Sequence, residues 1–521
     1  MNIYEFVGVV EGKVIYKQWP SQTYVTVADG TIPVSLIGRY YVFEEISIIY
    51  DLDTPVIDPL PTPPNLYTTA QSEFTDTSHI NFRSNWEVVG GVLKSLGASN
   101  NDVRMDFDVP ITAGRPHVAV WEQSVGTSGS YKLLFGGDGS AQGQNRNATD
   151  DRHCAEWFPA SEIDGNFTRF GFNPTSLSTD VEFDNVKVYD VSSTDPTQVA
   201  CDVILVLGDS IVTNAVSDPV TSSNVNTPFD PRCWYIPSLL DSPQANALTG
   251  SVRHVPQPLF EPAQSASNAQ RISPLSALAS KIVGYSATRN GRPLLLLSCG
   301  KAGTGLNGDD DWDKDSTKPD TGGVMYAEFL ATVAAMQALG PEHQIIGAVV
   351  SLGSNDFTGV DYDSVWVPKA QSFIANVRAD LGIPDLPFVW LGTAPKYEVG
   401  NGPDYDNLSG LPRRAERMRA AQASLAENSG HANAVTGVRF VSSIDSPYEG
   451  NGNHVPDAWG YHKEVHHDAA GTEGNGYVLG NVLRFMLDPN IYDENGENPV
   501  GILTDGNGDP IWDANYDLIT E

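Results

Sequence analysis

The triplet "GDS" at residues 208–210 is the part of the sequence best suited to chemistry, because it directly follows the apolar run "VILVL" at residues 203–207. A serine held at the end of a buried strand becomes a nucleophile when an adjacent base takes its proton. Three later segments contain residue types that would assist Ser210: "KAGTGL" around Gly303, "GSND" around Asn355, and "HKEVHHDAAG" with its neighbouring histidines. These residue types favour acyl transfer through a serine, with amide groups that stabilise an oxyanion.

Further apolar runs predict the strands that position these residues. After residue 200 such runs alternate with helical stretches; the runs are "VILVL", "LLLLS" (294–298), "IIGAVV" (345–350), "PFVWLG" (387–392) and "GVRFV" (437–441), and the helical stretches are 273–285, 324–339, 413–428 and 477–487. This alternation predicts the α/β class, with a doubly wound, five-stranded parallel sheet covered by helices on both faces. Ligands bind beyond the carboxyl ends of such strands, so the serine, glycine, asparagine and histidine are expected at one rim.

The four residues, in this order and at strand ends, resemble the SGNH hydrolase superfamily, also called GDSL-like esterases, over about residues 200–488. The resemblance implies a flavodoxin-like fold and a serine esterase that needs neither a metal nor an organic cofactor. It also implies that Ser210 is the nucleophile and His466 its base. The segments "KAGTGL" and "GSND" are similar to those of branches that remove acetyl groups from carbohydrates, which implies a carbohydrate O-acetylesterase.

The oxyanion hole of such an enzyme is expected to consist of the backbone N–H groups of Ser210 and Gly303 and the side-chain amide of Asn355. Removing one such donor typically slows catalysis roughly a hundred- to thousandfold. Glycine suits position 303 because a side chain there would block the approach of the carbonyl group. Asp209 and Asp356 are expected to brace their loops rather than to react.

The segment around the histidine departs from the family pattern, which usually has an aspartate three residues before the base. For His466 that position holds Lys463, whereas for the alternative base, His467, it holds Glu464. The spacing to Gly471 favours His466, because the family commonly has glycine five residues after the base. Three interpretations stay open: Glu464 serves as the acid, the enzyme uses a Ser-His dyad, or the site has decayed and only binds.

Each motif also has a plain structural interpretation, such as a turn capped by asparagine for "GSND" or a solvated patch for the histidines. His462 and His466 are four residues apart and would share one face of a helix. No Glu-x-x-His pattern accompanies them, so we expect no zinc site and no other metal site. The four cysteines show no Cys-x-x-Cys spacing, which argues against a disulfide framework.

The chain is predicted to contain three folded regions, a linker and a tail. Apolar and polar residues alternate over residues 1–50, which predicts a small β module. The proline-rich segment 51–64 indicates a linker. Short strand-like runs predict an all-β sandwich at 65–198, whose last run, "FDNVKVYDV", resembles the final strand of carbohydrate-binding jelly-roll modules. The hydrolase domain is expected at 199–488 and a β-rich tail at 489–521.

The 521 residues carry 31 Lys and Arg against 65 Asp and Glu, a formal net charge of −34. So acidic a surface repels nucleic acid and anionic membranes, and no apolar run is long enough to span a bilayer. We therefore expect neither nucleic acid binding nor membrane insertion. The first twenty residues lack the pattern of a secretory signal, which favours either the cytoplasm or a route that needs no signal.

We therefore expect a serine esterase that removes O-acetyl groups from a surface polysaccharide, with the sandwich holding the glycan. By analogy of architecture, the chain resembles a phage tail spike or fibre: a homo-oligomer attached to other virion proteins through its N-terminal module and acting at the host cell surface. The first alternative is a virion adhesin that binds host polysaccharide without catalysis, and the Lys463 departure favours it. The second is a cytosolic lipase or esterase for small acyl chains.

Overall fold

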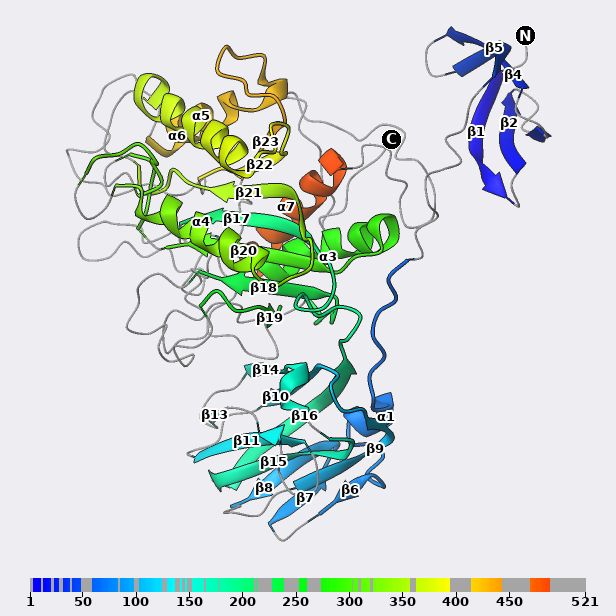
Figure 1. Cartoon of the computed structure of the whole chain (residues 1–521), viewed down its shortest axis with the longest axis vertical. Helices are drawn as coiled ribbons and strands as arrows, with labels where there is room; N and C mark the ends of the chain where they lie inside the picture. The colour runs from blue at the N-terminus through cyan, green and yellow to red at the C-terminus, as the bar shows by residue number, and fades with distance from the viewer. Residues whose placement is uncertain are drawn as a thin grey trace. The chain divides into compact units, whose positions relative to one another are not determined.

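The computed structural model divides into two compact units, Met1–Asp58 and Pro59–Glu521, and each is described by itself (Figure 1). The residues that the structure describes are 3–10, 13–19, 23–27, 31–37, 40–47, 59–82, 85–97, 103–123, 129–135, 141–142, 146–147, 152–163, 165–177, 179–209, 212, 227–238, 253–259, 273–301, 303–307, 311–318, 322–356, 362–393, 414–442 and 469–487. The predicted tail at 489–521 lies outside these residues.

The first unit is one antiparallel sheet of five strands in the order β3-β2-β1-β5-β4. Its strands are β1 (Ile3–Val10), β2 (Lys13–Trp19), β3 (Thr23–Val27), β4 (Thr31–Ile37) and β5 (Tyr40–Ser47). The small β module predicted from the alternating pattern is therefore present. The boundary between the units, at Asp58, falls within the proline-rich segment.

The second unit begins with a β-sandwich made of two antiparallel sheets, β14-β10-β16-β8-β7 and β12-β11-β15-β9-β6, with β13 also paired to β11. Its elements are α1 (Thr69–Ser72), β6 (Ile80–Asn81), β7 (Trp86–Val89), β8 (Val92–Leu96), β9 (Val103–Ile111), β10 (His117–Gln123), β11 (Gly129–Phe135), β12 (Ala141–Gln142), β13 (Arg146–Asn147), β14 (Arg152–Phe158), η1 (Ala160–Glu162), β15 (Phe167–Leu177) and β16 (Thr179–Asp190). Aromatic rings fill the space between the sheets, where Phe172 stacks on Phe183 with ring centroids 4.2 Å apart. This arrangement confirms the predicted sandwich.

A seven-stranded sheet follows, in the order β19-β18-β20-β17-β21-β22-β23 (Figure 1). Its strands are β17 (Asp202–Gly208), β18 (Cys233–Pro237), β19 (Gln257–Pro258), β20 (Leu294–Gly300), β21 (Gln344–Ser351), β22 (Phe388–Leu391) and β23 (Val438–Val441). The five predicted strands are all present and parallel. Two strands of the sheet were not predicted from the sequence: β18, a sixth parallel strand, and β19, a short antiparallel edge strand.

Helices cover both faces of this sheet, as predicted for a doubly wound fold. The helices are α3 (Leu275–Tyr285), which continues into the π-helical turn η3 (Ser286–Asn290), α4 (Val324–Gln337), α5 (Tyr362–Leu381), α6 (Arg414–Ser424), the 3-10 turn η4 (Glu427–Ser429) and α7 (Ala469–Leu487). Helices α3 and α7 share one apolar core with the sheet, and α4, α5 and α6 share the core on its other face (Figure 1). None of the described helices is long and apolar enough to cross a membrane.

Three helices differ from the sequence prediction. Helix α3 starts at Leu275, two residues after the start of the predicted stretch at 273, and the Ser273 hydroxyl accepts a hydrogen bond from the N–H of Leu275 at 3.2 Å. Helix α7 begins eight residues before the predicted start at residue 477, in a glycine-rich stretch that reads as a loop. Helix α5 was not predicted because Pro368 interrupts its pattern, yet the proline lies inside the helix.

The sandwich packs directly on the α/β part of the second unit. Along β10, alternate residues enter different cores: Ala119 and Trp121 face the sandwich interior, whereas Val118 and Val120 join the core of the parallel sheet. The indole of Trp157 meets that of Trp234 on β18 edge to face, with ring centroids 5.7 Å apart. The sandwich face at β10 and β14 is therefore an apolar interface rather than a solvated surface.

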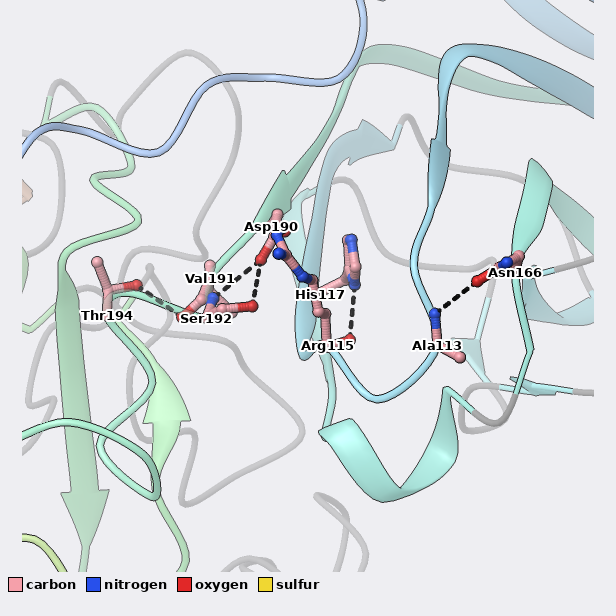
Figure 2. A network of polar contacts seen from close by, with 8 residues as sticks. All are labelled: Ala113, Arg115, His117, Asn166, Asp190, Val191, Ser192 and Thr194. Carbon is pink, nitrogen blue, oxygen red and sulfur yellow. Dashed lines mark hydrogen bonds and ion pairs between the residues drawn. The ribbon is translucent and has the colours of Figure 1, made fainter.

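Polar contacts fix the chain where it leaves the sandwich (Figure 2). The Asp190 carboxylate accepts hydrogen bonds from Arg115 Nη1 at 2.9 Å and from the N–H of Ser192 at 3.0 Å. The Thr194 hydroxyl then donates to the carbonyl oxygen of Pro231 at 2.9 Å, in the segment that leads into β18. Residues 190–194 thus tie the last sandwich strand to the edge of the parallel sheet.

Candidate active site

The carboxyl ends of β17, β20 and β21 lie side by side at the centre of the sheet. Gly208, the last residue of β17, is in register with Gly300 on β20 and with Ser351 on β21. The loops that follow these strands therefore start at one rim, which is where ligands bind in open parallel sheets. These loops begin with Asp209, with 301–307 and with 352–356.

Asn355 connects the three loops through its side-chain amide. Its Nδ2 donates to Asp209 Oδ2 at 3.3 Å and to the backbone oxygen of Thr304 at 3.2 Å. An amide nitrogen has two hydrogens, so both are engaged in this structure. Asn355 therefore lies where the sequence predicts an oxyanion donor, and one of these two long bonds must break before its amide can reach a substrate.

Glycines permit the close approach of backbone at this rim. A side chain at Gly208 would collide with the carbonyl oxygen of Ser351, which explains the glycine at the end of β17. Gly303 has a φ of 81°, in the left-handed region that favours glycine, and a Cβ atom there would meet no atom of the described residues within 4 Å. Its role as a backbone donor stays a prediction.

Asp356 braces the loop that follows β20. The backbone N–H groups of Leu306 and Asn307 donate to its carboxylate at 3.1 and 2.8 Å, and Trp366 Nε1 donates at 2.8 Å. Burial raises the pKa of Asp356 to about 6, although these three hydrogen bonds act to lower it. The contacts agree with the bracing role that the sequence suggested for this residue.

Asp209 also lies within the rim rather than in solvent. Its side chain is fully buried, its N–H donates to the carbonyl oxygen of Ser351 at 3.0 Å, and its carboxylate accepts the Asn355 amide. These contacts tie the end of β17 to the loop after β21. They are the contacts of a residue that positions its neighbours.

Sequence reasoning did not single out Thr304, although it lies in the quoted "KAGTGL" segment. Its carbonyl oxygen accepts the Asn355 amide, while its hydroxyl donates to the carbonyl oxygen of Lys301 at 2.8 Å. The same hydroxyl accepts from Trp312 Nε1 at 3.1 Å. The only signal for this residue in the sequence was a threonine placed between two glycines.

The remaining predicted catalytic residues lie outside the described residues: Ser210, Glu464, His466 and His467. The structure describes the chain immediately before the first, at Asp209, and shortly after the others, from Ala469 on α7. Their roles therefore stay predictions. Among the described residues, no group of three or more His, Cys, Asp or Glu side chains could hold a metal ion.

A cysteine near this rim is a poor nucleophile. Cys299 is the penultimate residue of β20, and its side chain is fully buried. Burial raises the pKa of its thiol to about 12, so the reactive thiolate is scarce at neutral pH. All four cysteines are buried and free of disulfide bonds.

The fold and this rim together define a doubly wound α/β domain that follows a β-sandwich. Residues 243–454 match the family model described as carbohydrate esterase, sialic acid-specific acetylesterase. The C-terminal half of the chain therefore contains a domain similar to the carbohydrate acetylesterases of this family. The matched range excludes Ser210, His466 and His467 and so assigns no role to them. A search of curated proteins found no match.

Several solved structures also match the chain, each at 14% sequence identity. A carbohydrate acetylesterase from Xanthomonas citri, XAC1771, matches with a TM-score of 0.37, over 73% of this chain and 75% of that one. NanS matches with a TM-score of 0.38, over 55% of this chain and 97% of its own. A family two carbohydrate esterase from Cellvibrio japonicus matches with a TM-score of 0.29, over 79% and 96%.

Proposed function

We propose that the protein is a serine esterase that removes O-acetyl groups from a polysaccharide. The observation that carries the proposal is the bonding of Asn355 to Asp209 and to the carbonyl oxygen of Thr304, which brings the loop with Gly303 to the rim where Ser210 follows in the sequence. The match of residues 243–454 to a carbohydrate esterase family supports the same reaction class and an acetylated carbohydrate as substrate.

In the proposed reaction, the Ser210 hydroxyl oxygen attacks the acetyl carbonyl carbon while His466 takes the hydroxyl proton. The negative charge on the carbonyl oxygen is stabilised by the N–H groups of Ser210 and Gly303 and by the Asn355 amide. The histidine then gives its proton to the leaving sugar oxygen, and the acetyl group stays on the serine. Water, activated by the same histidine, releases acetate and restores the free hydroxyl.

Two neighbouring histidines, His466 and His467, are candidates for the base, and variants of each distinguish them. His466 has the favoured spacing to Gly471, whereas His467 has Glu464 three residues before it. If His466 is the base, His466→Ala abolishes activity, His467→Ala does not, and Glu464→Gln has little effect on a Ser-His dyad. If His467 is the base, the order of the two histidine variants reverses and Glu464→Gln lowers kcat.

The decisive experiment measures acetate release from p-nitrophenyl acetate and from an acetylated polysaccharide. We expect the wild-type chain to release acetate from both and Ser210→Ala to lose at least roughly a thousandfold in kcat. Ser280→Ala, an exposed serine on α3, is the matched control and should keep full activity. Absence of release by the wild-type chain, or undiminished release by Ser210→Ala, would rule out the proposed mechanism.

We also propose that the chain is a virion spike or fibre protein that acts at the host cell surface, as a homo-oligomer attached to other virion proteins through residues 1–50. The separate compact unit at Met1–Asp58 and the proline-rich segment beside it support this placement. The test is whether residues 1–58 bind purified virion components while acetate release depends on the rest of the chain.

The alternative of an inactive adhesin predicts polysaccharide binding without acetate release. A cytosolic small-acyl esterase predicts release from small esters alone.

A further inference from the structure

A buried carboxylate on α7 holds the segment that precedes β18. Glu473 is only 2% exposed, and its Oε1 accepts two hydrogen bonds from Thr227, one from the backbone N–H and one from the hydroxyl, each at 3.0 Å. The Thr227 hydroxyl also lies 2.7 Å from the Tyr477 hydroxyl, one helical turn further along α7. We call these three residues the Thr227 clamp.

The direction of the hydrogen bonds in the clamp follows from the number of available protons. A threonine hydroxyl has a single proton, which it donates to Glu473. The Tyr477 hydroxyl must therefore donate to Thr227, and the chain of bonds ends on the carboxylate. Hydrogen bonds in such a buried network are protected from competition with water. The clamp is thus a fixed link rather than an incidental surface contact.

The clamp joins the two parts of the chain that flank the predicted nucleophile and base. Helix α7 begins at Ala469, directly after the histidine segment, and Glu473 lies near that end of the helix. Thr227 lies on the stretch that connects the Ser210 loop with β18. Close packing fixes the helix further along, because a side chain at Gly476 would collide with the backbone oxygen of Pro274 next to α3.

The sandwich holds the other side of the clamped segment. The ring of Phe229 packs against Tyr189 of β16 with centroids 5.7 Å apart, and Pro231 accepts the hydrogen bond from Thr194. Residues 227–231 are therefore held by the sandwich on one side and by α7 on the other. This arrangement gives the sandwich a role in shaping the site, in addition to any binding of glycan.

We propose that Thr227, Glu473 and Tyr477 are positioning residues, which fix the start of α7 so that the preceding histidine meets the serine hydroxyl. This inference rests on the proposed function, because it assigns a geometric task to that site. Displacing a catalytic group by about 1 Å costs on the order of a hundredfold in rate. Loss of the clamp should therefore reduce turnover more than it reduces substrate binding.

The test compares Thr227→Val, which removes the hydroxyl at nearly constant volume, with Thr227→Ser, which retains it. We expect the valine variant to lose roughly ten- to a hundredfold in kcat with KM nearly unchanged, and the serine variant to recover most of the loss. Tyr477→Phe should lose less, because the two bonds to Glu473 remain. Thr332→Val is the matched control: it removes another buried threonine hydroxyl, bonded to the Glu328 carbonyl on α4, and should leave kcat unchanged.

A second measurement does not depend on activity. Amide hydrogen exchange at residues 469–475 should be faster in Thr227→Val than in the wild-type chain or in Thr332→Val. Wild-type kcat in Thr227→Val, an equal loss in Thr332→Val, or unchanged exchange would each overturn the positioning role. If Ser210→Ala abolishes acetate release while Thr227→Val does not, the clamp alone is refuted. If the wild-type chain releases no acetate, the proposed function fails, and the exchange result alone shows whether the clamp fixes the helix.

Discussion

Strand β17 has a buried aspartate at each end, and each aspartate accepts a hydrogen bond from an asparagine amide. At the amino end Asn290 donates to Asp202, and at the carboxyl end Asn355 donates to Asp209. Both carboxylates belong to fully buried residues, and both asparagines are partly buried. The two ends therefore contain the same pair of residue types in similar surroundings.

The two pairs differ in what surrounds them. At the amino end Arg292 lies 3.8 Å from the Asp202 carboxylate and also donates to Gln344, so neighbouring side chains close the cluster. At the carboxyl end the Asn355 amide divides its two long bonds between Asp209 and the Thr304 carbonyl, beside the open position at Gly303. We infer that the amino-end pair serves stability, whereas the carboxyl-end pair holds an amide that can exchange partners.

The largest expected effect that separates the two ends is on catalysis. Asn355→Ala removes the predicted oxyanion donor and should lower kcat by about a hundred- to thousandfold, or roughly 3–4 kcal/mol. Asn290→Ala, the matched change at the amino end, should leave kcat unchanged and reduce the free energy of unfolding by about 1–3 kcal/mol, because Asp202 loses a buried donor. Acetate-release kinetics and urea unfolding measure the two quantities. Equal kcat values for the two variants would remove the distinction between the ends.

The next effect concerns the pH dependence of stability at the carboxyl end. The folded-state pKa of Asp356 is raised to about 6 from a usual value of 3.8. Between these values the folded state binds more protons than the unfolded state, so stability falls as the pH rises. Asp356→Asn removes this slope. Its free energy of unfolding, relative to that of the wild type, should therefore rise by about 3 kcal/mol from pH 4 to pH 7. Urea unfolding at several pH values measures it.

The amino end provides the control for that prediction. Burial also raises the pKa of Asp202, so Asp202→Asn should flatten the pH dependence in the same direction. Of these two aspartates, Asp356 alone holds the loop that carries Gly303. Asp356→Asn should therefore also lower kcat, by roughly tenfold, whereas Asp202→Asn should not. A loss of kcat in Asp202→Asn would show that both ends of the strand support the site.

The sequence predicts the carboxyl-end cluster better than the amino-end one, because glycines and polar residues directly follow apolar runs there. Five of the seven strands of this sheet were predictable for the same reason. The sequence indicated that Asp356 braces a loop, but not which groups it binds, because its three hydrogen-bond donors come from two separate segments. The sequence shows which residues follow each strand, and not which of them meet.

Tertiary packing explains the elements that sequence reasoning missed. Helix α7 has glycine at positions 476 and 480, where α3 packs closely against it, and this contact is invisible in a single sequence. The burial of strand β18 against Trp157 depends on the sandwich. The Thr227 clamp joins residues 246 positions apart, so no local pattern indicates it.

The smallest expected effect compares two glycines with the same backbone conformation. Gly303, near the carboxyl end, and Gly382, which follows α5 on the amino side, have φ angles of 81° and 68°. A Cβ atom on either would meet no atom within 4 Å in the part of the chain that the structure describes. Alanine at either position should therefore cost about 1–2 kcal/mol of unfolding free energy through backbone strain alone. If the Gly303 N–H faces the oxyanion, only Gly303→Ala should also lower kcat, because its methyl group crowds the carbonyl. Equal kcat values for Gly303→Ala and Gly382→Ala, at equal loss of stability, would exclude position 303 from the oxyanion hole.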